Sequence, residues 1–150
     1  MTRLDTTWDG VPISKEPPFG ASVVVYRRNS DRVEFLVLHR AHRGKAWAGE
    51  WAWTPPAGAR RPNEPISDCA QRELMEETGL ALVLEATNHG SEAWAVYCAE
   101  AAPAAVIRLD REHDRYEWQS FEQAAAMCLP ETVSDYMLAI GKELRSNHLV

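Results

Sequence analysis

The chain is poor in cysteine, in long apolar runs and in positive charge. Its three cysteines (Cys69, Cys98 and Cys128) lie far apart and none forms a C-x-x-C pair, so we expect reduced thiols. No apolar run approaches the about 18 residues that a membrane-spanning helix needs. Lys and Arg number 16 against 22 Asp and Glu, a net charge of −6, which argues against general nucleic-acid binding. Because residues 1–5 also lack a signal peptide's apolar stretch, a cytoplasmic protein is expected.

The length of 150 residues predicts one domain, since a chain of this size can bury a core of its own. Residues 1–19 contain three prolines and little periodicity, so an extended N-terminal arm over the surface is expected there. There is no internal repeat or low-complexity segment. Strands are expected first, with helices in the middle and at the end of the chain, which indicates an α+β or mixed α/β fold.

The patterning predicts these elements individually. Runs rich in β-branched residues at 21–26 and 33–39 flank a turn and predict a hairpin. Further strands are expected over 81–85, 92–99 and 104–109, and a charged loop over 110–117. Short helices are expected over 65–78 and 121–127. A final amphipathic helix is expected over 131–144, with an apolar stripe of Val133, Tyr136, Met137, Ile140 and Leu144.

The segment from residue 58 to 80 carries the most informative pattern. It places two glycines, one arginine and four carboxylates at fixed spacings, namely Gly58, Glu64, Arg72, Glu73, Glu76, Glu77 and Gly79. At about 100° per residue, the carboxylates of Glu73, Glu76 and Glu77 fall within an arc of about 100° on one helix face. Three carboxylates so close repel one another, and a hard cation such as Mg²⁺ or Mn²⁺ would relieve the repulsion. The alternative is a solvated acidic helix face.

The full string G-x5-E-x7-R-E-U-x-E-E-x-G-U, with U a bulky apolar residue, resembles the signature of the Nudix hydrolases without a departure. The run from Trp53 to Gly58 is similar to the W-x-x-P-x-G segment that leads into this signature. The likeness extends over about residues 20–145. It implies an α/β/α sandwich with a mixed sheet, a loop-helix-loop signature, and hydrolysis of a nucleoside diphosphate linked to another moiety.

The resemblance also implies roles for the signature residues. Glu76 and Glu77 are expected to bind the metal, and Glu73 to bind it or to accept a proton from the attacking water. The carbonyl of Gly58 is a further expected ligand, and a side chain there would crowd the ion. Structural roles are expected for three other residues, with Glu64 and Arg72 forming an ion pair that braces the loop and Gly79 ending the helix.

A later segment, 112–118, resembles the family's E-x5-W segment, whose glutamate can complete the metal site. Glu112 is therefore a candidate ligand, with Glu117 as the competing carboxylate and a solvated charged loop as the alternative. His113 is interpreted as part of the loop surface rather than as a ligand.

Substrate contacts are expected outside the signature. Arg40, Arg43 and Lys45 precede it and could hold a phosphate chain, although surface charge is the alternative. Tyr97 lies 17 residues after Leu80, which is similar to diadenosine polyphosphate hydrolases, where such a tyrosine can stack on adenine; a half-buried strand residue is the alternative.

The expected substrate is thus a small nucleotide, with a diadenosine polyphosphate preferred. A nucleoside triphosphate pyrophosphohydrolase and an ADP-ribose pyrophosphatase stay open, the latter disfavoured because Pro103 comes too late for that subfamily's proline. A nucleotide-sensing module without turnover is another class, but such modules usually lose a signature glutamate. A messenger-RNA cap or RNA 5′-end processor is disfavoured by the acidic chain. A homodimer is possible because many relatives are dimers.

Overall fold

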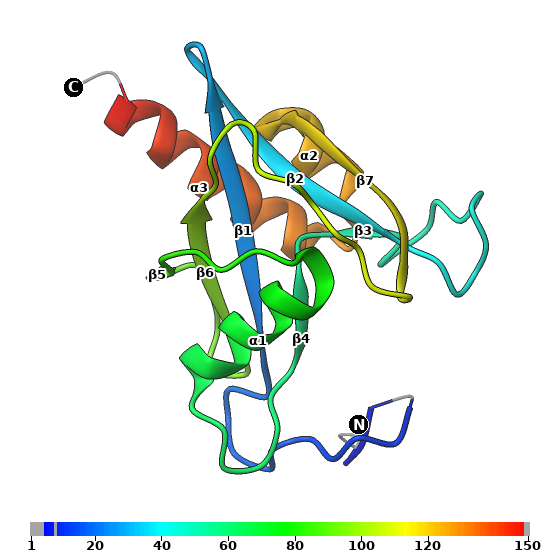
Figure 1. Cartoon of the computed structure of the whole chain (residues 1–150). Helices are drawn as coiled ribbons and strands as arrows, with labels where there is room; N and C mark the ends of the chain where they lie inside the picture. Colours follow the sequence, from blue (N-terminus) through cyan, green and yellow to red (C-terminus); the bar gives the residue numbers. More distant parts are fainter. Residues whose placement is uncertain (1–4, 8, 149–150) are drawn as a thin grey trace.

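The structure is a computed structural model that describes residues 5–7 and 9–148. Figure 1 shows its elements in order along the chain. The strands are β1 (Gly20–Asn29), β2 (Arg32–Arg40), β3 (Trp53–Thr54), β4 (Ala57–Ala59), β5 (Glu85–Ala86), β6 (Trp94–Glu100) and β7 (His113–Ser120). The helices are α1 (Ile66–Thr78), α2 (Phe121–Met127) and α3 (Glu131–His148).

The two long strands β1 and β2 form an antiparallel hairpin only near their turn, where Tyr26 pairs with Phe35. Further along, β4 becomes the antiparallel partner of β1, and β3 becomes the partner of β2. The other edge of β1 pairs in parallel with β6, and the other edge of β2 pairs with β7. The chain between β3 and β4 therefore enters the sheet where β1 and β2 separate.

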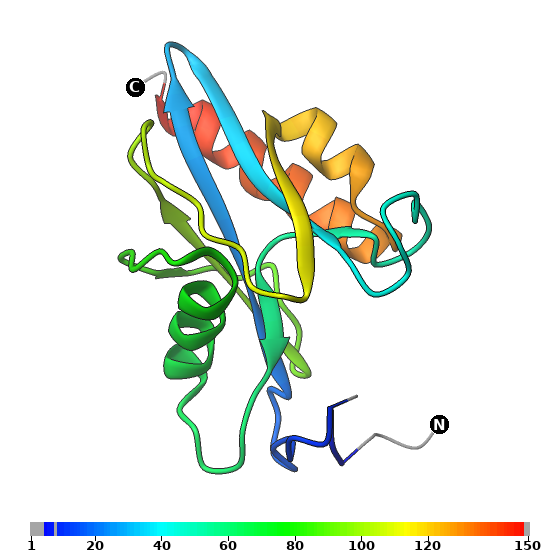
Figure 2. The same cartoon turned by 45° about the vertical axis from the view of Figure 1, so that its right-hand side comes forward.

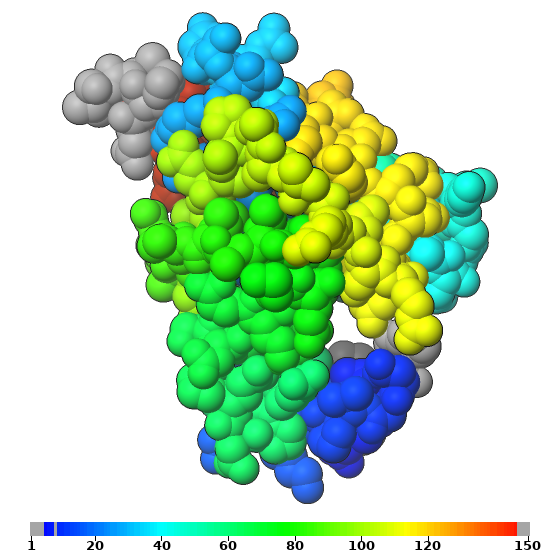
Figure 3. Space-filling view, viewed as in Figure 1, coloured from blue at the N-terminus to red at the C-terminus, as the bar shows by residue number. Residues whose placement is uncertain are grey.

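Helices cover both faces of this mixed sheet, as Figures 1 and 2 show. Alternate residues of β1 point to opposite faces, so Val23 and Val25 pack under α1 while Val24 packs under α2 and α3. Figure 3 shows α1 and the segments that follow it covering the first face. The architecture is the expected α/β/α sandwich, with one apolar core on each side of the sheet.

Most expected elements are confirmed. The hairpin and the helices occur where the patterns place them, with the last helix continuing to His148, and all five residues of its apolar stripe are buried. The three cysteines are free and buried. Among the described residues of the arm, the only β-bridge joins Thr6 to Pro12. No helix in the described part of the chain is long and apolar enough to cross a membrane.

Three local expectations were wrong. Residues 104–109 form no strand, because backbone amides there bond outside any ladder, Arg108 N–H to the carbonyl at the end of α1, Thr78, at 2.8 Å and Ala105 N–H to the Ala102 carbonyl at 3.0 Å. The charged stretch 110–117 is not all loop, since His113 begins strand β7 and alternating polar residues suit its half-covered face. The strand expected over 81–85 is reduced to Glu85–Ala86.

Candidate active site

Two carboxylates of α1 lie beside each other, one buried and one partly buried. Glu77 is only 2% exposed, and its Oε1 accepts a hydrogen bond from the Ala57 amide at 3.3 Å. Glu73, one helical turn earlier, is partly buried and close enough for its charge to act on Glu77. Burial, together with the adjacent Glu73 carboxylate, raises the pKa of Glu77 well above its usual range, and burial also raises the pKa of Glu73. The pair therefore retains a proton at a pH where exposed carboxylates have lost theirs.

A glycine allows β4 to lie directly against this pair. A β-carbon built on Gly58 would stand 2.1 Å from the carboxyl carbon of Glu73, far inside contact distance. Any side chain at this position would displace the carboxylate. The Gly58 carbonyl is 3.8 Å from Cys69 Sγ, on the side of the strand that faces α1.

Arg72 braces the loop before α1. Its guanidinium holds Glu64 in a fork, with Nε to Oε2 at 2.8 Å and Nη2 to Oε1 at 2.9 Å. A further bond from Nη2 reaches the Ala59 carbonyl at 3.0 Å, and Nη1 bonds Glu73 Oε1 at 2.7 Å. The hydrogen bond from Arg72 lowers the pKa of Glu64. Gly79 ends the helix in the left-handed region, at φ 75°, where glycine is favoured.

The third signature carboxylate is more exposed than the other two. Glu76 is half-exposed and faces arginines, at 3.5 Å from Arg72 and 3.7 Å from Arg61. Nη1 of Arg72 contacts both Glu73 and Glu76, so these two carboxylates lie at one guanidinium, and the convergence of all three on one ion stays a prediction. Within the described residues, no three acidic, histidine or cysteine side chains form a ready-made ion site.

The chain at the start of β7 also lies near the Glu73–Glu77 pair. Glu112 is open to solvent on one side, and partial desolvation by its neighbours, followed by the charges of Asp110 and Glu73, raises its pKa. His113 is buried rather than part of a loop surface, with Nδ1 2.9 Å from Asp110 and Nε2 3.8 Å from Glu77 Oε1. Desolvation lowers the pKa of His113. If residues 113–120 had been recognised as a strand, His113 would have been predicted on its inward, buried face.

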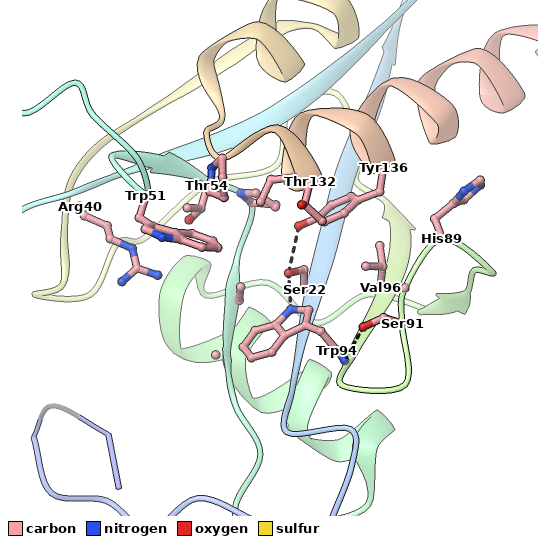
Figure 4. A pocket seen from close by; sticks show the side chains of 16 residues that line it. Ser22, Arg40, Trp51, Thr54, His89, Ser91, Trp94, Val96, Thr132 and Tyr136 are labelled. Atoms are coloured by element: carbon pink, nitrogen blue, oxygen red, sulfur yellow. Dashed lines mark hydrogen bonds between the residues drawn. The ribbon is translucent and has the colours of Figure 1, made fainter. Parts of the chain in front are cut away.

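A cavity of about 720 Å³ opens on the other side of β4 (Figure 4). It lies between the sheet, the loops at 51–58 and 89–91, and the start of α3. Gly58 lines it and also meets Glu73, so the cavity and the carboxylate pair share this residue. Its wall includes Ser22, Trp51, Trp94 and Tyr136, which the sequence did not single out as site residues.

The residues predicted to contact the substrate do not all lie at the same place. Arg40 lines the cavity, and its buried Nε has no hydrogen-bond partner in the described part of the chain. The guanidinium of Arg43 instead stacks over Trp47, 4.7 Å from the ring centre, and Lys45 is exposed on the same loop. Tyr97 packs on the α1 face of the sheet, opposite to the cavity, because it alternates with Val96 along β6. It therefore does not line this cavity, and its stacking on adenine stays a prediction.

The site has the chemistry that a divalent cation requires. Two adjacent desolvated carboxylates are an unfavourable arrangement when both are charged, and a hard ion between them would neutralise both. Glu73 and Glu77 would hold such an ion, and the more exposed Glu76 and Glu112 would have to turn toward it. The described residues thus offer an all-oxygen donor set beside a cavity.

This chain belongs to the Nudix family, since the profile of the NUDIX domain matches residues 17–138. It is a pyrophosphohydrolase of that family. Among curated proteins it is similar to a mouse bis(5′-nucleosyl)-tetraphosphatase (asymmetrical), with 29% identity over 70% of this chain and 80% of the relative.

Solved structures agree on the fold. A C. elegans Ap4A hydrolase binary complex superimposes with a TM-score of 0.69 at 22% identity, covering 85% of this chain and 97% of that one. RenU, a Nudix hydrolase of M. smegmatis, has a TM-score of 0.71 at 18% identity, covering 98% and 96% of the two chains.

Proposed function

We propose that this enzyme hydrolyses a phosphoanhydride bond of a dinucleoside polyphosphate, with diadenosine polyphosphates preferred and Mg²⁺ or Mn²⁺ as cofactor. The observation that carries the proposal is the Glu73–Glu77 pair, which meets an open cavity at Gly58. A nucleoside in the cavity would place its phosphates against the carboxylates. The similarity to asymmetrical bis(5′-nucleosyl)-tetraphosphatases supports the choice of substrate.

Glu73 and Glu77 are the proposed metal ligands, joined by Glu76, Glu112 and the Gly58 carbonyl. The bound cation would neutralise phosphate charge and lower the pKa of a water molecule. We assign the proton of the attacking water to Glu73, because Arg72 holds its Oε1 at 2.7 Å and so fixes its orientation. Glu64 and Gly79 keep structural roles, the first through its ion pair with Arg72.

Arg40 is the proposed phosphate contact. Its unpartnered Nε lies at the cavity, and its charge also affects both Glu112 and His113. It therefore stands between the nucleoside side and the acidic side of the site, where a phosphate chain would run. Arg43 and Lys45 extend positive charge along the adjacent loop and are proposed as weaker, solvated contacts.

A nucleoside triphosphate is the second candidate substrate. The cavity of about 720 Å³ can take a single nucleoside, which is all that a triphosphate requires. A cytoplasmic location, a single domain and a homodimer stay predictions.

The test is a product assay on diadenosine tetraphosphate, ATP and ADP-ribose with Mg²⁺, with and without excess chelator. We expect diadenosine tetraphosphate to be preferred and to give ATP and AMP, because water adds across an asymmetrically placed bond. Preference for ATP would select the second candidate. Turnover that continues in chelator would contradict the role of the metal.

A further inference from the structure

Three side chains from three elements meet at the wall of the cavity. The indole Nε1–H of Trp94 donates to the Ser22 hydroxyl at 2.9 Å, and the Tyr136 hydroxyl lies 3.2 Å from the same oxygen (Figure 4). They come from β6, β1 and α3 respectively. All three line the cavity, and Ser22 is only 3% exposed.

The two hydrogen bonds of this group use two of its three polar hydrogens. Serine and tyrosine hydroxyls each have one hydrogen to donate, whereas the indole N–H can only donate. The indole uses one lone pair of Ser22, and the contact between the two hydroxyls uses one of their two hydrogens. Whichever hydroxyl donates in that contact, one O–H hydrogen finds no acceptor among the residues that the structure describes. Burial raises the pKa of Tyr136 to about 12, so its hydroxyl keeps its hydrogen at neutral pH.

The indole of Trp94 is fixed in position beside this donor. Its nitrogen is held by Ser22, and its ring lies against Gly20, where an added β-carbon would be 2.3 Å from two ring carbons. A preorganised aromatic surface next to an unused hydrogen-bond donor suits a flat heterocycle that carries an acceptor atom.

We propose that the Ser22–Tyr136 pair donates its remaining hydroxyl hydrogen to an acceptor atom of a nucleobase that stacks on Trp94. Ser22 and Tyr136 are then specificity-determining residues of the cavity. The inference rests on the proposed function, because it takes the ligand to be a nucleotide.

The hydrogen count ranks the variants. Tyr136→Phe leaves the Ser22 hydrogen free to donate, so the KM for diadenosine tetraphosphate should rise less than about twofold. Ser22→Ala removes the acceptor of the Trp94 N–H but keeps the tyrosine hydroxyl. The double variant Ser22→Ala/Tyr136→Phe has no hydroxyl donor left and should show the largest KM, with kcat little changed. It does free the Trp94 N–H, but that hydrogen lies in the plane of the indole and does not point toward a base stacked on the ring.

The experiment measures the binding of AMP and of its 1-deaza, 3-deaza and 7-deaza analogues by quenching of tryptophan fluorescence. Each analogue replaces one ring nitrogen acceptor by a C–H group. One analogue should bind the wild type about fivefold more weakly than AMP does, the value of one neutral hydrogen bond. That difference should disappear in the double variant. Equal binding of all four ligands, or a difference that survives in the double variant, would overturn the proposal.

Thermal melting checks that each variant is folded. Tyr26→Phe is the control variant, because Tyr26 is a buried tyrosine of the same core that does not line the cavity. If the double variant does not fold, Ser22→Cys in the Tyr136→Phe background keeps the shape and weakens the donor. Hydrolysis by the wild type without discrimination among analogues refutes only this inference. Discrimination without hydrolysis refutes only the proposed activity, and failure to bind AMP refutes the proposed ligand.

Discussion

The two sides of strand β4 differ in how their residues are brought together. On the α1 side, Glu73, Glu77 and Arg72 come from one helix and are ordered by charge, with a fork from Arg72 to Glu64 and a carboxyl group at Glu77 whose pKa is raised by burial and by Glu73. On the cavity side, the wall comes from β1, β6, α3 and two loops, and it is mostly apolar. The chemical groups are therefore local in sequence, and the recognition surface is dispersed.

This difference has an energetic counterpart. Buried carboxylates are costly, so the α1 side stores an electrostatic strain that a cation can relieve. The cavity side has little charge and gains specificity from a few hydroxyl groups and aromatic rings. Changes on the first side should alter turnover, and changes on the second should alter affinity.

Glu77→Gln should have the largest effect on turnover, and it changes only the carboxylate side of β4. We expect kcat to fall by at least about 10³-fold, because a metal-binding charge is lost at the reacting phosphate. Stability should be unchanged or higher, since the carboxyl group it replaces is buried beside another. Steady-state kinetics and urea unfolding measure both effects, with exposed Glu92→Gln as the control. Near-normal turnover would remove Glu77 from the site.

Gly58→Ala should lower both stability and turnover, because Gly58 lies between the carboxylates and the cavity. The new methyl group would stand 2.1 Å from the carboxyl carbon of Glu73. We expect a loss of about 1–3 kcal/mol in unfolding free energy, as for other overpacked positions. Displacement of the base should also lower kcat by about 10²-fold. An unaltered kcat would show that β4 does not position Glu73.

Arg40→Ala tests the connection between the two sides. We expect the KM for diadenosine tetraphosphate to rise about tenfold, the value of one charge-assisted contact to phosphate. Binding of adenosine, which has no phosphate, should be unaffected and serves as the control. An equal loss for adenosine would place Arg40 in nucleoside binding instead.

The metal-free enzyme should lose stability as pH rises above 4.5. The pKa of Glu77 in the folded protein is raised above the ordinary value of 4.5, so its stabilising contribution is complete below pH 4.5 and is lost as pH rises through the pKa of the folded protein. Urea unfolding in chelator between pH 5 and 8 measures the slope. Glu77→Gln should flatten it, and a slope equal to that of the wild type would assign the effect to other groups.

Tyr97→Ala should have the smallest effect on activity. Because Tyr97 packs on the face of the sheet opposite to the cavity, we expect an unchanged KM for adenine substrates. Partial loss of the packed ring should lower the unfolding free energy by about 2 kcal/mol. A raised KM without loss of stability would restore the stacking role first predicted for this tyrosine.

Periodicity and spacing were sufficient for the elements that have a strong local pattern. The α1 signature, the β1–β2 hairpin and the apolar stripe of α3 all follow from residues near one another in sequence. The error at 104–109 arose because an apolar run looks alike in a strand and in a buried loop. Ile107 is buried there, but the backbone has no strand partner.

The candidate site also divides into features that local sequence patterns predict and features that only the tertiary structure reveals. The signature indicated the carboxylates, but the contact of Glu76 with Arg61 depends on how the loop before α1 folds back on the helix. Tyr97 was assigned by its distance along the chain, which does not tell on which face of a sheet a residue lies. The sequence placed His113 on a loop surface because charged neighbours such as Glu112 and Asp114 are typical of exposed loops, whereas the structure buries it.

By itself, the sequence determined the family, the helix that carries the carboxylates and the expectation of a hard metal ion. These depend on spacing along one short segment, which helical geometry turns directly into position. The tertiary structure decided that Gly58 joins the carboxylate pair to the cavity. It also brought Ser22, Trp94 and Tyr136 together across that cavity, because strand pairing and helix packing place distant residues within hydrogen-bond distance.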